Sequence, residues 1–405
     1  METPRGILLA MDSAIGFYPD MNRPASTPKW QRQAKLLVGS LSVALATTAG
    51  AKNFLVYFGT YTNALSQGIY VSRLDATTGV LSDPELAAAT PSPCWVTISP
   101  DKKFLYASGE SAGVISAFAI DPQTGHLTLI NEKSSGGVDP CHVSVDASGR
   151  VLLVANYGDG TVKSFRLMAD GAIGSDGTFS QHVGHGPNAS RQAGPHAHFI
   201  TTDPSNRFAL ACDLGLDKVV VYALNTDSGA LELKSDFSTP TVPPGAGSRH
   251  LVFSRDGHFV HVVNEMGCSV TTLAWDAAKG SLTPVETVSA LPPGVAPEKR
   301  FTGAEILLHP SGKYVYVSLR GPDSVSVFKA NAKTGKLTLV QNVPSGGKVP
   351  RGLGIDPTGR WLITGNQKTD NAVEYAIDAR TGTLTPTGHE LKIGSPVDVK
   401  FVPVD

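Results

Sequence analysis

The chain has 405 residues, of which 41% are hydrophobic and 17% are charged, so it holds enough apolar material for a packed core and wholesale disorder is excluded. The chain has 34 Lys and Arg and 35 Asp and Glu, so its net charge is −1. Without an excess of basic residues to bind the phosphate backbone, we expect no nucleic-acid partner. The four cysteines are scattered and form no CxxC pair, which excludes a zinc ribbon and leaves open whether any of them pair.

The first 51 residues are predicted to be a leader that precedes the folded domain. Lys29, Arg32 and Lys35 come before an apolar run at 36–46, and small residues follow through Ala51. This order is typical of a secretory signal peptide. The run is shorter than the ~20 residues that a transmembrane helix needs. We therefore expect a periplasmic or secreted protein with no membrane span in the mature chain, or a cytoplasmic one if residues 1–51 reflect a misassigned start.

Residues 52–405 contain one sequence unit that recurs along the chain. Each unit has an alternating strand, a tight turn and a second apolar strand, as in Pro93–Ser108, and further copies begin at Pro140, Pro195, Ser248, Gly303 and Pro350. The residues that anchor the turns lie 47 to 57 positions apart, at Ser99, Asp146, Asp203, Ser254, His309 and Asp356. A period of this length indicates a repeat fold with one supersecondary unit per repeat.

A second motif, a glycine turn followed two residues later by Leu or Ile, gives an independent count. It occurs seven times, at Gly79, Gly125, Gly171, Gly229, Gly280, Gly335 and Gly382. Seven units of four short antiparallel strands predict an all-β, seven-bladed β-propeller. The seventh copy of the first motif is split, with residues 395–403 as its first strand and 54–59 as its second, so we expect one blade to be built from both ends of the chain. A linear solenoid would need polar end caps, and the sequence has none.

The predicted blades should bring polar residues to one mouth of the central channel. In an antiparallel blade, the start of the first strand and the end of the second lie at the same end of the sheet, and the first strand is innermost. The first-strand starts carry Cys141, His142, His196, His198, Arg249, His250, Glu305, Arg351 and Asp398. The second-strand ends carry Thr60, Tyr61, Glu110, Asn156, Tyr157, Asp213, Asn264, Glu265, Arg320, Asn366 and Gln367. Arginine suits carboxylate or phosphate, so this rim predicts an anionic small-molecule ligand.

Other interpretations of the rim remain open. The histidines could only bond neighbouring loops, and the arginines could pair structurally with Glu265, Glu305 or Asp213. We expect no metal site at His196 and His198, the two histidines that follow Pro195. The chain has no Walker loop, so nothing supports a nucleotide enzyme, and it has no HExxH motif. Residues 181–194 form an inserted loop near the rim, interpreted as a lid or a mobile linker.

Three long stretches, 194–222, 245–270 and 350–375, resemble the seven-bladed propeller lactonase family, and the likeness covers residues 53–403. That family contains the bacterial propeller-type 6-phosphogluconolactonase and the fungal carboxy-cis,cis-muconate cyclase. The resemblance implies a catalytic set of one histidine, two arginines and one glutamate. It assigns these roles to His198, five residues before Asp203, to Arg249 and Glu265, sixteen residues apart, and to Arg320 at the end of Val-Ser-Leu-Arg.

We therefore expect a monomeric lactone hydrolase without a cofactor, acting on an anionic sugar-acid lactone like that of a 6-phosphogluconolactonase. Glu265 is assigned as general base, with His198 positioning the water or protonating the leaving alkoxide. Arg249 and Arg320 would bind the anionic group and stabilise the oxyanion. The expected substrate-binding residues are Arg351, His196, His250, Asn264 and Gln367.

Two alternatives use the same rim. One is a cyclase that closes a muconate to a lactone. The other is a non-catalytic extracytoplasmic propeller that binds an anionic small molecule, which mutual pairing and occlusion of Glu265 and the arginines would favour. The leader departs from the family's pattern, because phosphogluconolactonases of this family generally act in the cytoplasm, where sugar phosphates are found.

Overall fold

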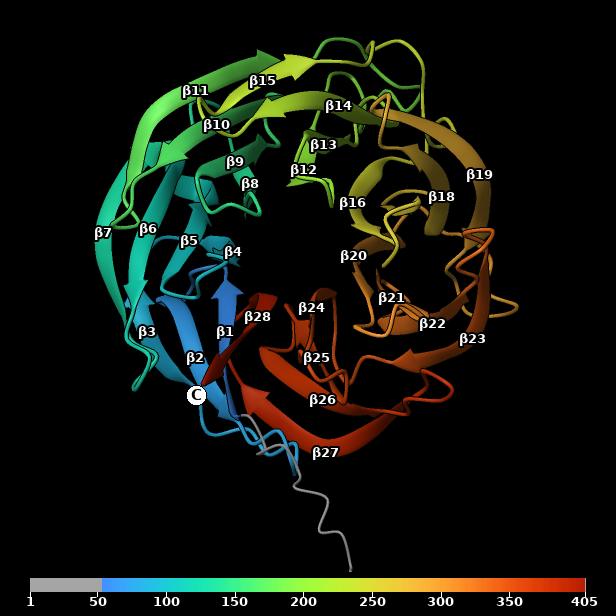
Figure 1. Ribbon diagram of the computed structural model, residues 1–405. Coiled ribbons are helices and arrows are strands. Elements are labelled where there is room, and N and C mark those ends of the chain that lie inside the picture. The colour runs from blue at the N-terminus through green and yellow to red at the C-terminus, as the bar shows by residue number, and fades with distance from the viewer. Residues whose placement is uncertain (1–52, 405) are drawn as a thin grey trace, which may run out of the picture. The chain divides into compact units, whose positions relative to one another are not determined.

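Each copy of the repeated unit forms one four-stranded antiparallel sheet in the computed structural model, which describes residues 53–404. The predicted leader, 1–51, lies outside the described residues. The sheets, here called blades 1 to 7, are arranged in a ring (Figure 1). From the innermost strand outward, the strands are β28 (Pro396–Val404), β1 (Asn53–Thr60), β2 (Gly68–Leu74) and β3 (Glu85–Ala89) in blade 1; β4 (Pro93–Ile98), β5 (Phe104–Gly109), β6 (Val114–Ile120) and β7 (Leu127–Ser134) in blade 2; β8 (Pro140–Val145), β9 (Val151–Asn156), β10 (Thr161–Leu167) and β11 (Ile173–Gln181) in blade 3; β12 (Ala197–Thr202), β13 (Phe208–Asp213), β14 (Lys218–Asn225) and β15 (Ala230–Leu233) in blade 4; β16 (Ser248–Phe253), β17 (Phe259–Asn264), β18 (Ser269–Asp276) and β19 (Ser281–Ser289) in blade 5; β20 (Thr302–Leu308), β21 (Tyr314–Arg320), β22 (Ser324–Ala330) and β23 (Leu337–Pro344) in blade 6; and β24 (Pro350–Ile355), β25 (Trp361–Asn366), β26 (Asn371–Ile377) and β27 (Leu384–Lys392) in blade 7.

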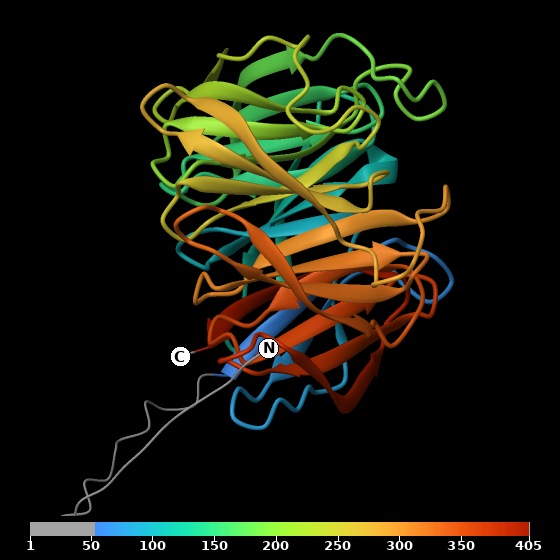
Figure 2. The ribbon, with the colours of Figure 1, turned by 90° about the vertical axis from the view of Figure 1, so that its right-hand side faces the viewer.

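The ring closes in blade 1, as the split repeat predicts. Strand β28 pairs antiparallel with β1, with Asn53 opposite Val404 and Tyr57 opposite Lys400 (Figures 1 and 2). Blades 1 and 7 also pack against each other, since Phe54 of blade 1 belongs to the same buried hydrophobic cluster as Ile363 of blade 7. Every other pair of neighbouring blades shares such a cluster, so the predicted propeller is confirmed and a linear solenoid is excluded.

The turn between the first two strands of a blade is fixed by its predicted anchor residue. In blade 3, the carboxylate of Asp146 accepts the backbone N–H groups of Arg150 and Val151, each at 2.7 Å. In blade 7, Asp356 accepts those of Arg360 and Trp361 at 2.8 and 2.7 Å. Because these backbone donors have no ladder partner in the turn, the carboxylate of the anchor residue supplies their acceptor in these two blades.

The recurring glycine turns serve a second purpose, which is packing between blades. Gly280 has a φ of +68° and Gly382 has a φ of +75°, a conformation that favours glycine. A Cβ on Gly280 would lie 2.3 Å from the ring of Phe208 in blade 4, and one on Gly382 would lie 2.4 Å from Tyr314 in blade 6. In five of its seven copies, at Gly79, Gly171, Gly280, Gly335 and Gly382, the motif therefore marks a point where one blade's turn meets an aromatic ring of the preceding blade.

Aromatic side chains of the innermost strands fill the channel below its predicted polar mouth. The ring of His142 lies 4.4 Å from Trp95 and 4.1 Å from Phe199, measured between centroids. The ring of His250 lies 5.0 Å from both Trp95 and Phe199. These rings pack against one another at the axis, and a cavity lies at the end where the innermost strands begin. Within residues 53–404 the one helix is a single 3-10 turn, Glu110–Ala112, and none is long and apolar enough to cross a membrane.

Candidate active site

A cavity of about 350 Å³ lies at the mouth of the channel. Each of the seven blades contributes to its lining, which consists of Tyr61, Glu110, Cys141, Tyr157, Arg191, His198, Glu265, Thr302, Arg320 and Arg351. The positions of most of these lining residues can be predicted from strand direction. Each of those is either the second residue of an innermost strand or lies at the end of the strand next to it. The ring thus gathers side chains that are almost 300 positions apart in the sequence.

A repeated irregularity in the sheets aims several of these side chains. In five blades the pairing of the innermost strand shifts register at its second residue, which is Cys94, Cys141, His198, Arg249 or Arg351. A β-bulge leaves one residue unpaired and redirects its side chain. In blade 6 the irregular stretch lies between Gly303 and Ile306 and contains Glu305. The bulges therefore place ionisable groups at the axis, where regular pairing would place strand side chains on the blade faces.

Glu265 lies at the centre of the cavity's charge network. One carboxylate oxygen, Oε1, accepts from Nη2 of Arg191 at 2.7 Å. The other, Oε2, accepts from Nε of Arg249 at 3.0 Å and lies 2.9 Å from Nη2 of Arg320. Burial alone would raise the pKa of Glu265, but Arg320 and Arg249 hold that pKa well below its usual range. Both oxygens are engaged by cations, so Glu265 is a weak proton acceptor.

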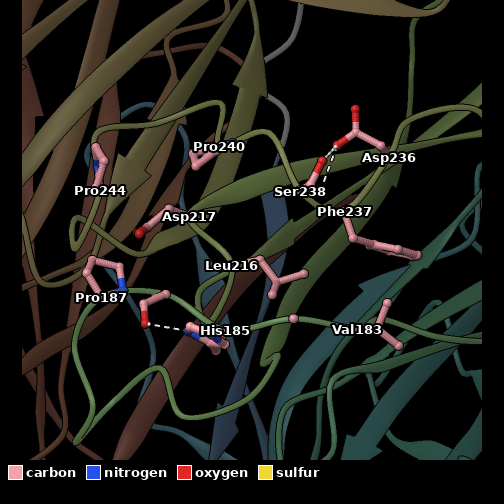
Figure 3. A pocket seen from close by; sticks show the side chains of 12 residues that line it. Val183, His185, Pro187, Leu216, Asp217, Asp236, Phe237, Ser238, Pro240 and Pro244 are labelled. Atoms are coloured by element: carbon pink, nitrogen blue, oxygen red, sulfur yellow. Dashed lines mark hydrogen bonds between the residues drawn. The ribbon is translucent and has the colours of Figure 1, made fainter.

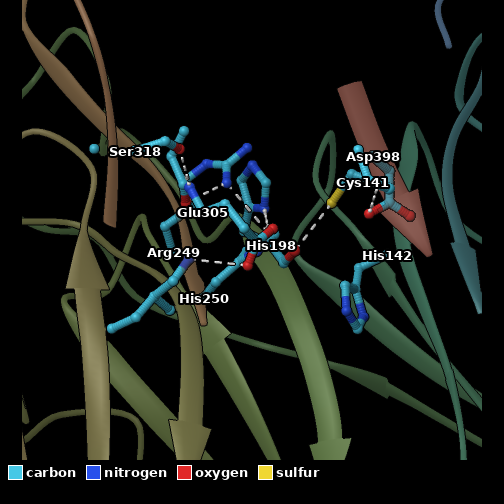
Figure 4. Close-up of polar contacts among 12 residues, drawn as sticks. Cys141, His142, His198, Arg249, His250, Glu305, Ser318 and Asp398 are labelled. Atoms are coloured by element: carbon cyan, nitrogen blue, oxygen red, sulfur yellow. Dashed lines mark hydrogen bonds and ion pairs between the residues drawn. The ribbon is translucent and has the colours of Figure 1, made fainter. Parts of the chain in front are cut away.

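His198, unlike Glu265, has a ring nitrogen that is available to accept a proton. Its Nδ1 lies 3.2 Å from Nε2 of His250, while its Nε2 forms no hydrogen bond with any residue in the range 53–404 (Figure 4). Burial, together with Arg249 and His250, holds the pKa of His198 well below its usual range. The imidazole is therefore neutral at physiological pH, and a neutral ring next to a cavity can accept a proton.

Arg351 is the cation of the cavity whose donors are unused. No residue among 53–404 accepts a hydrogen bond from its guanidinium, which lies 5.4 Å from the centroid of the Tyr61 ring. The Tyr61 hydroxyl donates to Oε2 of Glu110 at 2.5 Å. Burial would lower the pKa of Arg351, but Tyr61 and Glu110 raise it above its usual value. Arg351 is therefore a fixed positive charge with a free planar fork, the arrangement that binds carboxylate or phosphate.

Sequence reasoning missed Arg191, which the inserted loop delivers to the cavity. Its Nη2 reaches Glu265 as described and lies 3.2 Å from the Tyr157 hydroxyl. The loop is tied down on both sides of Arg191. Nδ1 of His182 lies 2.6 Å from Asp213, and the Gln192 amide donates to Asp217 at 2.8 Å. Strand periodicity cannot locate a loop residue. The one available signal was an arginine within an insertion that was expected to lie over the rim.

Five of the predicted site residues do not line the cavity, namely Arg249, His196, His250, Asn264 and Gln367. Arg249 is buried, bonded to Glu265 and to the Ala304 carbonyl at 2.6 Å. His196 stacks on Tyr157 at 4.6 Å, and the Asn264 amide donates to the Ser269 and Thr271 hydroxyls at 2.9 Å each. These positions support Glu265, Tyr157 and the blades, and direct substrate contact by these five side chains gains no support from the geometry.

A larger cavity, of about 700 Å³, lies beside blade 4 between the loops at 183–187 and 236–244 (Figure 3). Its carboxylates are already used, because Asp217 accepts the backbone N–H groups of Gly245 and Gly247 at 2.7 Å each, and Asp236 accepts that of Ser238 at 2.7 Å. No arginine or lysine is among the described residues that line it. The axial cavity is therefore the candidate active site.

Comparison with known proteins identifies the family of the chain. The family model described as "Lactonase, 7-bladed beta-propeller" matches residues 55–401. A 6-phosphogluconolactonase of Bacillus subtilis is 34% identical over 86% of this chain and 98% of its own. A 6-phosphogluconolactonase of Formosa agariphila is 32% identical over 74% of this chain and 85% of its own.

Among solved structures, the periplasmic gluconolactonase of Pseudomonas aeruginosa superposes with a TM-score of 0.80 and 29% identity, over 87% of this chain and all of its own. Blade number, closure and full-length similarity therefore agree, and the chain belongs to the seven-bladed β-propeller lactonase family.

Proposed function

We propose that the protein is a lactone hydrolase whose substrate is a sugar-acid lactone with an anionic group, in the manner of a 6-phosphogluconolactonase. One observation carries this proposal: the guanidinium of Arg351 and Nε2 of His198, neither of which has a hydrogen-bond partner among residues 53–404, open into one cavity. The four arginines around the cavity outnumber Glu110 and Glu265 by two charges, which favours an anionic ligand. The names of the relatives support the same substrate class.

The geometry favours His198 over Glu265 as general base. Both oxygens of Glu265 are held by arginines, and its pKa is lowered, so it would have to break an ion pair to accept a proton. His198 is neutral and has a lone pair at the cavity. We assign Glu265 the task of holding Arg191 and Arg320 in place, and Arg249 the task of holding Glu265.

The reaction then takes two steps. His198 removes a proton from water, the oxygen bonds to the lactone carbonyl carbon, and the carbonyl electron pair moves onto its oxygen. Arg320, with Arg191 beside it, stabilises that oxyanion. The intermediate collapses, the ring C–O bond breaks, and the alkoxide takes back the proton, so that lactone and water become the hydroxy acid. Arg351 binds the remote anionic group and fixes the orientation of the ring.

The substrate preference bears on the cellular location. A preference for a phosphorylated lactone would favour the cytoplasm, where sugar phosphates are found. A preference for the unphosphorylated lactone fits the predicted export leader, as in the periplasmic gluconolactonase that the chain resembles.

A substrate panel tests the proposal. The purified protein is assayed with 6-phosphogluconolactone, gluconolactone, a carboxylated lactone and cis,cis-muconate, each against its spontaneous rate. We expect accelerated hydrolysis of the sugar lactones, fastest for the phosphorylated one. Conversion of the muconate alone would favour the cyclase. Binding of a lactone without any acceleration would favour the non-catalytic propeller, and either result would contradict a lactonase.

A further inference from the structure

A buried chain of three ionisable groups runs from the cavity into the ring. The carboxylate oxygens of Glu305 lie 3.0 and 3.2 Å from Nδ1 of His250, and Nε2 of His250 lies 3.2 Å from Nδ1 of His198 (Figure 4). All three side chains are buried, and only His198 reaches the cavity. Oε1 of Glu305 also accepts the backbone N–H of Ile306 at 3.0 Å, which fixes the direction of the carboxyl group.

Arg249 determines which nitrogen of each ring carries the proton. Its Nη1 lies 3.4 Å from Nε2 of His250. A guanidinium has donors and no acceptor, and the Glu305 carboxylate needs a donor at Nδ1, so in the resting state the neutral ring of His250 is unprotonated at Nε2. The proton of His250 is then on Nδ1 and is donated to Glu305. His198, which faces the unprotonated Nε2, must donate from its own Nδ1. Nε2 of His198 is thereby left with a lone pair at the cavity end of the Glu305–His250–His198 series.

A positive charge on either ring is disfavoured by the surroundings. Arg249 lies against both histidines, and Arg351 acts on both through the cavity; together with burial they hold the pKa of each ring well below its usual range. An imidazolium at His198 would therefore be a poor resting place for a proton taken from water. Glu305 differs, because a proton there neutralises a buried negative charge and creates no positive one.

We propose, on the basis of the proposed lactonase function, that Glu305 is the terminal proton acceptor and that His250 and His198 pass the proton to it. As the water oxygen bonds to the carbonyl carbon, a water proton moves to Nε2 of His198, the Nδ1 proton of His198 moves to Nε2 of His250, and the Nδ1 proton of His250 moves to Glu305. The protons return along the same path to the alkoxide when the ring C–O bond breaks. Glu305 and His250 act through His198 and are positioning residues, since neither lines the cavity.

The charges around Glu305 allow it to act near neutral pH. It faces Arg249 and His250 from β16, Lys400 and Asp398 from β28, and Arg351 from β24. Burial outweighs the cations and raises the pKa of Glu305 to about 7. Glu305 must be ionised to accept the proton, so kcat should rise with pH through this value and level off above it. His198 titrates far lower and does not contribute to that rise.

The variant Glu305→Gln keeps a hydrogen-bond partner for His250 and removes the acceptor. We expect kcat to fall about 10- to 100-fold, with KM little changed and with the rise in kcat near neutral pH lost. Gluconolactone is used beside the phosphorylated substrate, because a phosphate group titrates in the same range. The control is Glu374→Gln in blade 7, which replaces another buried glutamate that pairs with a histidine, here the partly exposed His389 at 2.9 Å, and should leave kcat unchanged.

Nitrogen NMR of the imidazole rings tests the chain without substrate. We expect the unprotonated nitrogen of His198 to be Nε2 in the wild type, assigned by comparison with His198→Gln. Protonation of His198 on Nε2, or a Glu305→Gln enzyme with the wild-type kcat and pH profile, would overturn the relay and leave the lactonase proposal standing. A wild type that accelerates no lactone would overturn the proposed function. The NMR result would still decide in which direction the hydrogen bonds from His198 through His250 to Glu305 are donated.

Discussion

The His198→Gln variant is expected to lose ~10²- to 10⁴-fold in kcat for lactone hydrolysis, with KM little changed, because the amide cannot take a proton from water. The glutamine can still occupy the space of the ring and donate a hydrogen bond, so the cavity and its arginines should persist. Steady-state kinetics with 6-phosphogluconolactone measure both parameters.

The control for this variant is His196→Gln, two residues earlier on the same strand start. His196 stacks on Tyr157 outside the cavity lining, so its replacement should leave kcat near the wild-type value. The assignment of the base would be wrong if His198→Gln kept its rate while Glu265→Gln lost it with the pH dependence of a titrating carboxylate. That pattern would restore Glu265 as the base.

The second large effect is expected for Arg351→Met, and it should be selective. Charge-assisted hydrogen bonds contribute ~1.5–3 kcal/mol each, so loss of a two-bond contact should lower kcat/KM for the phosphorylated lactone by ~10²-fold or more. Gluconolactone lacks the phosphate, so its kcat/KM should change little. Parallel assays of the two substrates give the ratio directly. An equal loss for both would place Arg351 at the reacting carbonyl instead of at the remote anionic group.

The fold and most of the cavity lining could be predicted from the sequence, because both follow from periodicity and strand direction. Two independent repeat counts gave seven blades, and positions such as Tyr61, Glu110, His198 and Arg351 were placed at the mouth because they begin or end predicted strands. Arg191 and Thr302 were missed, since Arg191 comes from the inserted loop and Thr302 opens a strand whose start was placed one residue later, at Gly303.

The chemical roles were harder to predict than the positions. A sequence pattern placed Glu265 at the rim, but it could not show that three arginines engage both carboxylate oxygens. Asn264 was expected to bind substrate because it ends β17, yet its side chain turns into the blade toward Ser269. The direction of a side chain at a strand end depends on local bulges and neighbouring blades, and neither can be derived from spacing alone.

A crystal structure with the product 6-phosphogluconate bound tests the central claim most directly, because it locates both ends of the ligand. We predict that the C1 carboxylate lies within hydrogen-bond reach of Nε2 of His198 and of Arg320, with the phosphate on Arg351. Product bound in the cavity beside blade 4, or with its phosphate on the Arg191 side and its carboxylate away from His198, would contradict the account.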